Sequence, residues 1–120
     1  MVNATRLDYN NLGWGNVHAR QIALLLPELK QLTYLDLSRN WIGPEGSKAI
    51  AEALKSGTSV LTSLNLYDNS IGPEGGKAIA EALKSGTSVL TTLNLYGNNL
   101  GDAEQQLLDA VKGREGFELE

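Results

Sequence analysis

The chain has 120 residues, a net charge of -4 and no cysteine. This length allows one domain with a modest core, and the lack of cysteine excludes disulfides, thiolate metal sites and thiol catalysis. The acidic balance gives no reason to expect a nucleic acid or an anionic membrane as partner. The opening segment, MVNATRLDYN, lacks the apolar run of a secretion signal, so a cytoplasmic location is expected.

An internal repeat of 29 residues organises the chain. Residues 43–62 and 72–91 match at 19 of 20 positions and differ only at Ser47 and Gly76. The segments before them also align, as LTYLDLSRNWIG (32–43), LTSLNLYDNSIG (61–72) and LTTLNLYGNNLG (90–101). A fainter copy, VNATRLDYNNLG, covers residues 2–13. All four copies fit the pattern L-x-x-L-x-L-x-x-N-x-L, the first one loosely, and such periodicity predicts a stacked repeat array.

In chain order, the repeats predict an N-terminal cap, two regular units and a C-terminal cap. Their ranges are 1–31, 32–60, 61–89 and 90–120, within a single domain. Terminal repeats must shield the ends of the core, and both ends here are atypical. Aligned on its asparagine, the first repeat has two additional residues before Ile22.

Each repeat opens with a short strand. Leu35 and Leu37 are two residues apart, so both point to one face of the strand. Asparagine recurs after each strand, at Asn40, Asn69 and Asn98, with Asn10 as the fourth member. A stack of side-chain amides can bind the backbone groups exposed where each strand turns away. We therefore predict a buried asparagine ladder, with ordinary surface turn residues as the alternative.

A helix follows each strand, starting with GPEGSK at residues 43–48 and GPEGGK at residues 72–77. Pro44 suits the first helical turn, and Gly57 lies just past the helix end, where a left-handed residue can close it. Glycines before a lysine also resemble a phosphate loop, but the Walker pattern needs Ser or Thr where Ala78 stands. The stretch is therefore predicted to be a structural turn, and no cofactor is expected.

The last repeat ends in FELE, which alternates apolar and charged residues. We interpret it as a short edge strand with Phe117 and Leu119 facing inward and the glutamates discouraging edge pairing. The chain has one histidine, His18, and no Ser–His–Asp or metal-ligand spacing. An enzyme or a metal site is therefore not expected.

The repeat pattern, together with the helix sequence GxKAIAEAL, resembles the ribonuclease inhibitor-like leucine-rich repeat family. The resemblance covers essentially residues 2–112. It implies an α/β leucine-rich repeat solenoid of about four repeats, curved, with parallel strands on the concave face and helices on the convex face. The spacing indicates the same architecture independently, because strand–helix units that bury one face must stack.

The strand positions between the leucines are expected to project from the concave face, where they differ between repeats. The alignment groups Asn3 with Thr33, Ala4 with Tyr34, Arg6 with Asp36, Asp8 with Ser38 and Tyr9 with Arg39. Tyrosine, tryptophan and arginine dominate binding hot spots. The predicted protein-binding patch is Tyr34, Asp36, Arg39, Trp41, Tyr67, Asp68 and Tyr96, with the aspartates as charge partners. As the alternative to a binding surface, threonine columns and stacked tyrosines can serve strand stability alone.

Three functional hypotheses remain. The first is a non-catalytic protein-binding module that uses the concave face to bind a protein partner of unknown identity, with the chain a monomer or weak homo-oligomer. The second is a designed or truncated repeat scaffold with no natural partner. The third, a regulator of a small GTPase, is implied only by the family resemblance. Fold alone does not decide among them.

Overall fold

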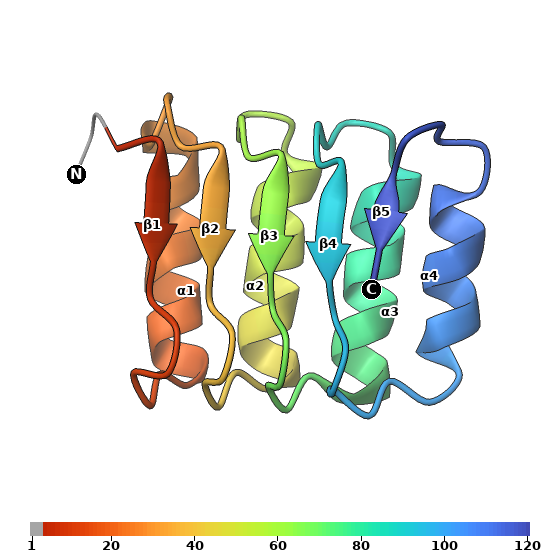
Figure 1. Cartoon of the computed structure of the whole chain (residues 1–120), viewed down its shortest axis with the longest axis horizontal. Helices are drawn as coiled ribbons and strands as arrows, with labels where there is room; N and C mark the ends of the chain where they lie inside the picture. The colour runs from red at the N-terminus through yellow and green to blue at the C-terminus, as the bar shows by residue number, and fades with distance from the viewer. Residues whose placement is uncertain (1–3) are drawn as a thin grey trace.

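Strands and helices alternate along the chain in the computed structural model, which describes residues 4–120. Asn3, which the sequence alignment grouped with the threonines, lies outside the described residues. The elements are β1 (Arg6–Asp8), α1 (Asn16–Leu25), the 3₁₀ helix η1 (Leu26–Glu28), β2 (Tyr34–Asp36), α2 (Pro44–Lys55), β3 (Ser63–Asn65), α3 (Gly72–Lys84), β4 (Thr92–Asn94), α4 (Ala103–Val111) and β5 (Glu118–Leu119). The five strands form one parallel sheet in chain order (Figure 1).

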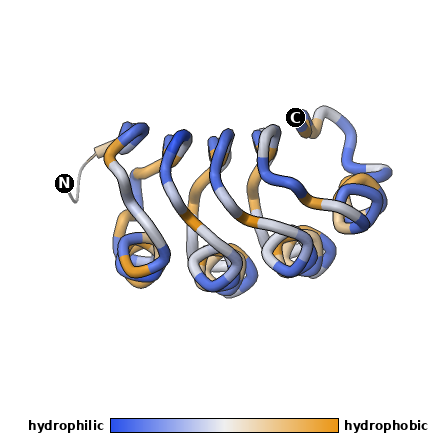
Figure 2. Tube along the Cα trace, turned by 90° about the horizontal axis from the view of Figure 1, so that it is seen from below, coloured by the Kyte–Doolittle hydropathy of each residue, from blue (hydrophilic) through white to orange (hydrophobic). Residues whose placement is uncertain are grey.

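The sheet and the four α-helices form two layers. Figure 2 shows the strands along one side and the helices along the other, with the strands drawn closer together, so that the sheet lines the concave side. This arrangement confirms the predicted α/β solenoid of about four repeats. Within residues 4–120, no helix is long and apolar enough to cross a bilayer.

The core lies between the two layers. Leu35, Leu64 and Leu93 stand in register on neighbouring strands and are fully buried. The helices approach each other closely where glycine replaces larger residues. A Cβ atom on Gly75 would lie 2.6 Å from Ile71 Cγ2 and 3.1 Å from Ser47 Cβ, closer than real side chains come. The glycine of the repeated turn is therefore a packing requirement.

The predicted asparagine ladder is present in the second, third and fourth repeats. The Asn69 amide nitrogen donates to the carbonyls of Leu37 and Leu66, both at 3.0 Å, and its oxygen accepts from the Ile42 N–H at 3.0 Å. Asn40 and Asn98 bridge neighbouring repeats in the same way. All three side chains are buried, so the alternative of ordinary surface turn residues is wrong.

The prediction that Asn10 is the fourth member of the ladder is wrong. Leu7 pairs with Leu35 in the sheet. The register of the first repeat therefore differs by two residues from the sequence alignment, which had matched Asn10 with Asn40. The N–H of Leu12 donates to the Asn40 side-chain oxygen at 3.0 Å, as the N–H of Asn69 does to Asn98. Leu12 therefore stands at the ladder position, and the two additional residues inferred from the sequence do not exist. Leucine has no polar side-chain atom, so this position makes none of the side-chain bonds of the ladder.

At the other end of the sheet, β5 pairs in parallel with β4 through Glu118 and Leu119. Phe117 and Leu119 pack partly against the core, which confirms the predicted edge strand and its inward-facing residues. The Arg114 guanidinium donates to the carbonyl of Leu90 at 2.7 Å and lies over the Phe117 ring, 4.8 Å from its centroid. This arginine fixes the last segment to the fourth repeat.

Candidate functional site

Two tyrosines at the ends of adjacent strands form the centre of the candidate site. Tyr67 follows β3 and Tyr96 follows β4, one repeat apart, and their rings stack with centroids 6.1 Å apart and planes 10° apart. Tyr67 is half-buried, whereas Tyr96 is 71% exposed. The structure thus confirms that the two rings lie side by side, as their equal repeat positions predicted.

Arg39 extends this pair on the N-terminal side. Its guanidinium carbon lies 5.7 Å from the centroid of the Tyr67 ring, within the range of a cation–π interaction. We call Arg39, Tyr67 and Tyr96 the tyrosine row. The three side chains present a cation and two aromatic faces in sequence, which is the kind of surface that binds partly hydrated protein groups.

In the loops that follow β2, β3 and β4, one residue at the same repeat position adopts a left-handed backbone conformation. The φ angles of Arg39, Asp68 and Gly97 are 57°, 56° and 79°, and the N–H groups of the first two donate to the carbonyls of Tyr67 and Tyr96. This conformation turns the chain away from the sheet while keeping one more bond to the next strand. It fixes the exposed rim positions, Arg39 and Asp68, beside the tyrosines.

Tyr34 lies apart from the row, on β2, and its partner was not foreseen. The Arg6 guanidinium lies 3.9 Å from the centroid of the Tyr34 ring. The sequence alignment grouped Arg6 with Asp36, because it was anchored on Asn10. Counting 28 residues back from Ile50 to Ile22 in the helices would have given the correct pairing of Arg6 with Tyr34.

Asp36 holds the backbone at the end of β2. Its carboxylate accepts from the Ser38 N–H at 2.9 Å and from the Ser38 hydroxyl at 2.6 Å. Asn65 and Asn94 make the same bond to the N–H groups of Tyr67 and Tyr96. This column therefore shapes the strand ends that carry the tyrosine row. A role for Asp36 as a charge partner stays a prediction.

Trp41 lies on the rim, in the loop between β2 and α2, and is 73% exposed. It borders a hollow of about 310 Å³ together with Arg39 and Asp68. Its backbone N–H donates to the carbonyl of Trp14 at 2.6 Å, which anchors the loop to the first repeat. The predicted patch thus divides into three places: Tyr34 and Asp36 on β2, the tyrosine row at the strand ends, and Trp41 and Asp68 on the rim. Tyr9, which the sequence alignment had grouped with Arg39 at the rim position, packs against the core instead.

The repeated GPEG turns have structural tasks. Pro44 is the first residue of α2 and Glu45 lies in its first turn, and Gly57, with φ of 77°, follows the helix end as predicted. Ile71, which stands where a Walker loop has its first glycine, is fully buried in the core. Across residues 4–120, no group of three or more His, Cys, Asp or Glu residues is placed to hold a metal ion.

Comparison with known families agrees with this architecture. The sequence model of the leucine-rich repeat matches residues 30–51, 59–80 and 88–103, which together make up half of the chain. The protein therefore belongs to the leucine-rich repeat family, whose domains are typically non-catalytic and bind proteins. No curated protein matches the chain significantly.

Proposed function

We propose that the protein is a non-catalytic binding module that holds a protein partner on its concave face, centred on the tyrosine row. The stacking of Tyr67 on the strongly exposed Tyr96 is the observation that carries this proposal. A half-buried ring stacked on an exposed one offers a wide apolar contact area, and the hydroxyl tips can bond to a partly wet partner surface. Anchors of this type commonly provide most of the binding free energy of an interface.

The surroundings of the row support the same proposal. Arg39 and Asp68 place opposite charges on the exposed rim beside the rings, where charges orient a partner more than they hold it. Asn65 and Asn94 accept hydrogen bonds from the N–H groups of Tyr67 and Tyr96 and so fix the backbone of both tyrosines, which reduces the conformational entropy lost when a partner binds. We also propose membership of the ribonuclease inhibitor-like branch, which the repeat length of 28–29 residues and the α-helix in each repeat support.

The test is a comparison of captured proteins between three immobilised forms of the chain. Replacing both Tyr67 and Tyr96 with alanine should weaken the binding of a genuine partner by at least ~2 kcal/mol, which is about thirtyfold in Kd. Leu24→Ala on α1 is the matched control, because this side chain is 79% exposed on the helical layer. A partner that the double variant still captures would contradict the proposal. If no captured protein is lost in that variant alone, the hypothesis of a repeat scaffold without a natural partner is favoured.

A further inference from the structure

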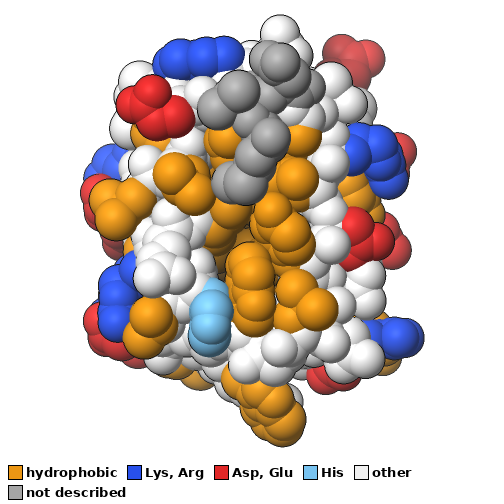
Figure 3. Space-filling model, turned by 90° about the vertical axis from the view of Figure 1, so that its left-hand side faces the viewer, with side chains coloured by type: hydrophobic (Ala, Val, Ile, Leu, Met, Phe, Trp, Pro, Cys, Tyr) orange, Lys and Arg blue, Asp and Glu red, His pale blue; other side chains and the backbone are white. Residues whose placement is uncertain are grey.

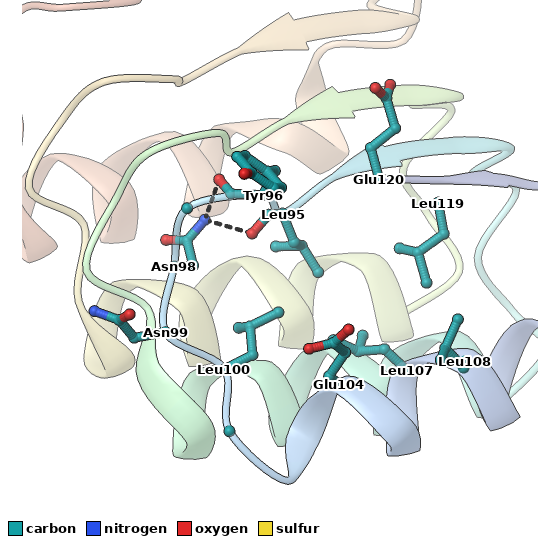
Figure 4. Close-up of a pocket in the computed structure, with 12 residues that line it drawn as sticks. Leu95, Tyr96, Asn98, Asn99, Leu100, Glu104, Leu107, Leu108, Leu119 and Glu120 are labelled. Carbon is teal, nitrogen blue, oxygen red and sulfur yellow. Dashed lines mark hydrogen bonds between the residues drawn. The ribbon is translucent and has the colours of Figure 1, made fainter.

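The hollow of about 310 Å³ beside Trp41 differs in character from both ends of the array. Figure 3 shows apolar side chains over the middle of the N-terminal end, and five leucines line the cavity of about 460 Å³ at the C-terminal end (Figure 4). The hollow instead lies between the loops that follow β1, β2 and β3, and six of the eight residues that line it are polar. It is therefore a polar site within the array, bounded by three successive repeats.

Five side chains of these loops can bind a ligand in the hollow: Asn11, Arg39, Asp68, Trp41 and Ser70. The first three stand at one position of neighbouring repeats, and the last two stand two residues further along their loops. Neighbouring strands of a sheet are about 4.8 Å apart, so the polar groups lie close together. Within residues 4–120, none of the five side chains forms a hydrogen bond or an ion pair. Their donors and acceptors are therefore available.

The asparagine ladder forms the floor of the hollow and holds its loops in place. Asn40 accepts from the N–H of Trp14 in the loop after β1, and Asn69 accepts from the N–H of Ile42 in the loop after β2. Each amide nitrogen also donates to the carbonyls two and three residues earlier, and Figure 4 shows the same two bonds from Asn98 in the fourth repeat. A fixed loop backbone reduces the conformational entropy lost when a ligand binds.

Gly13 leaves space next to Trp41 in the hollow. It stands at the position of Trp41 one repeat earlier, and a Cβ atom placed on it would have no atom beyond its chain neighbours within 4 Å. The Trp41 side chain is 73% exposed and presents an apolar ring surface together with one N–H donor. A flat ligand with both an apolar face and polar groups fits this combination.

The charges of the hollow favour a neutral ligand. Arg39 and Asp68 contribute one positive and one negative charge. A lysine side chain would pair with Asp68 but lie near the like charge of Arg39, and a carboxylate would pair with Arg39 but lie near Asp68. Hydroxyl groups avoid this conflict, because each can donate to a carboxylate or accept from a guanidinium or an indole N–H.

We propose that the hollow is a binding site for a neutral pyranose sugar. The apolar C–H face of the ring packs on the Trp41 indole, the Asp68 carboxylate accepts from hydroxyls, and the Arg39 guanidinium donates to sugar oxygens. The sugar is either a free saccharide or a glycan carried by a protein. This inference does not rest on the stacking of Tyr67 and Tyr96, so its test is separate from that of the proposed protein contact.

The test is a titration of the nitrogen-15-labelled full chain with the methyl glycosides of glucose, mannose, galactose and N-acetylglucosamine. The indole N–H signal of Trp41 should shift saturably with at least one of these neutral probes, with a Kd of ~1 mM, as expected for a ligand of this size. The indole signal of Trp14 is the internal control, because this residue is half-buried and does not line the hollow. Blocked trialanine, a neutral peptide, should shift neither signal.

Two variants locate the sugar in the hollow while leaving Trp41 in place as the reporter. Asp68→Ala removes a charged acceptor and should weaken binding by about tenfold or more. Gly13→Asn fills the space beside the indole and should also weaken it, and asparagine tolerates this backbone, since Asn99 at the corresponding position has a φ angle of 52°. Val89→Ala is the matched control, because this exposed side chain lies outside the hollow. Thermal melting checks that each variant remains folded.

Three results would overturn the proposal: no saturable shift of the Trp41 signal with any glycoside, an equal shift with trialanine, or full binding by both hollow variants. An array of immobilised glycans then distinguishes the two sources of the sugar. Tighter binding of a branched glycan than of its methyl glycoside would assign the site to a glycan on a partner protein. Equal binding of the two would assign it to a free saccharide.

Discussion

The first repeat and the two middle repeats solve the same structural problem with different residues. In the middle repeats, the ladder position is asparagine and the helix carries glycine at its closest approach, as at Gly75. In the first repeat these positions hold Leu12 and His18. The His18 ring accepts a bond from the Gly15 N–H at 3.0 Å and stacks on Trp14. The comparison teaches that each ladder asparagine serves the repeat before it, whose backbone it binds.

Removing a ladder asparagine is expected to have the largest effect. Asn69→Leu leaves the Ile42 N–H buried without an acceptor and removes two further bonds, to the carbonyls of Leu37 and Leu66. A buried unpaired donor costs roughly 1–3 kcal/mol by itself. We expect a loss of about 3 kcal/mol in the free energy of unfolding, measured by denaturant titration.

The first repeat provides the matched control for this substitution. Asn10 contacts the Asp8 side chain near the surface and bridges no neighbouring repeat. Asn10→Leu should therefore change the unfolding free energy by less than about 0.5 kcal/mol. Equal losses of unfolding free energy at Asn10 and Asn69 would show that the first repeat does not differ from the middle repeats in this way.

Enlarging the helix contact is expected to have the next largest effect. Gly75→Ala would bring a Cβ atom to 3.3 Å from Pro44 Cα, in addition to the closer contacts with Ile71 and Ser47. Overpacking of this kind typically costs about 1–3 kcal/mol. At the corresponding position of the first repeat, His18→Ala should lose only about 1 kcal/mol, the value of one hydrogen bond. Denaturant titrations of both variants check the difference, and a neutral Gly75→Ala would contradict the packing argument.

The same comparison explains what the sequence could predict. The leucine spacing and the 29-residue period were enough to predict the parallel sheet, the ladder at Asn69 and the adjacency of Tyr67 and Tyr96, because each depends on contacts that recur between like repeats. The register of the first repeat was predicted wrongly because Asn10 imitates the motif two residues early. The hydrogen bonds of Asp36 to Ser38 at the end of β2 were not predicted, for another reason. A carboxylate two residues before a serine gives no sign of whether it faces solvent or its own backbone.

The smallest expected effect concerns the aromatic contacts, which again differ between the middle of the array and its first repeat. Tyr67 and Tyr96 stack, and we expect their double-mutant cycle with alanine to give a coupling of about 0.5–1.5 kcal/mol in the free energy of unfolding. Arg6 and Tyr34 form the corresponding cycle across the first two strands, where an exposed cation–π contact is worth about 0.5–1 kcal/mol.

Each tyrosine variant should still fold, because the rings project from the sheet on the side away from the leucine core, and Tyr96 is largely exposed. A double variant that does not fold would make the tyrosine row a structural element and would leave the concave face without its main anchor. A folded double variant with near-zero coupling would show that the sheet hardly depends on the stack. The rings would then contribute little to the fold, and the case for a binding role of the row would be strengthened.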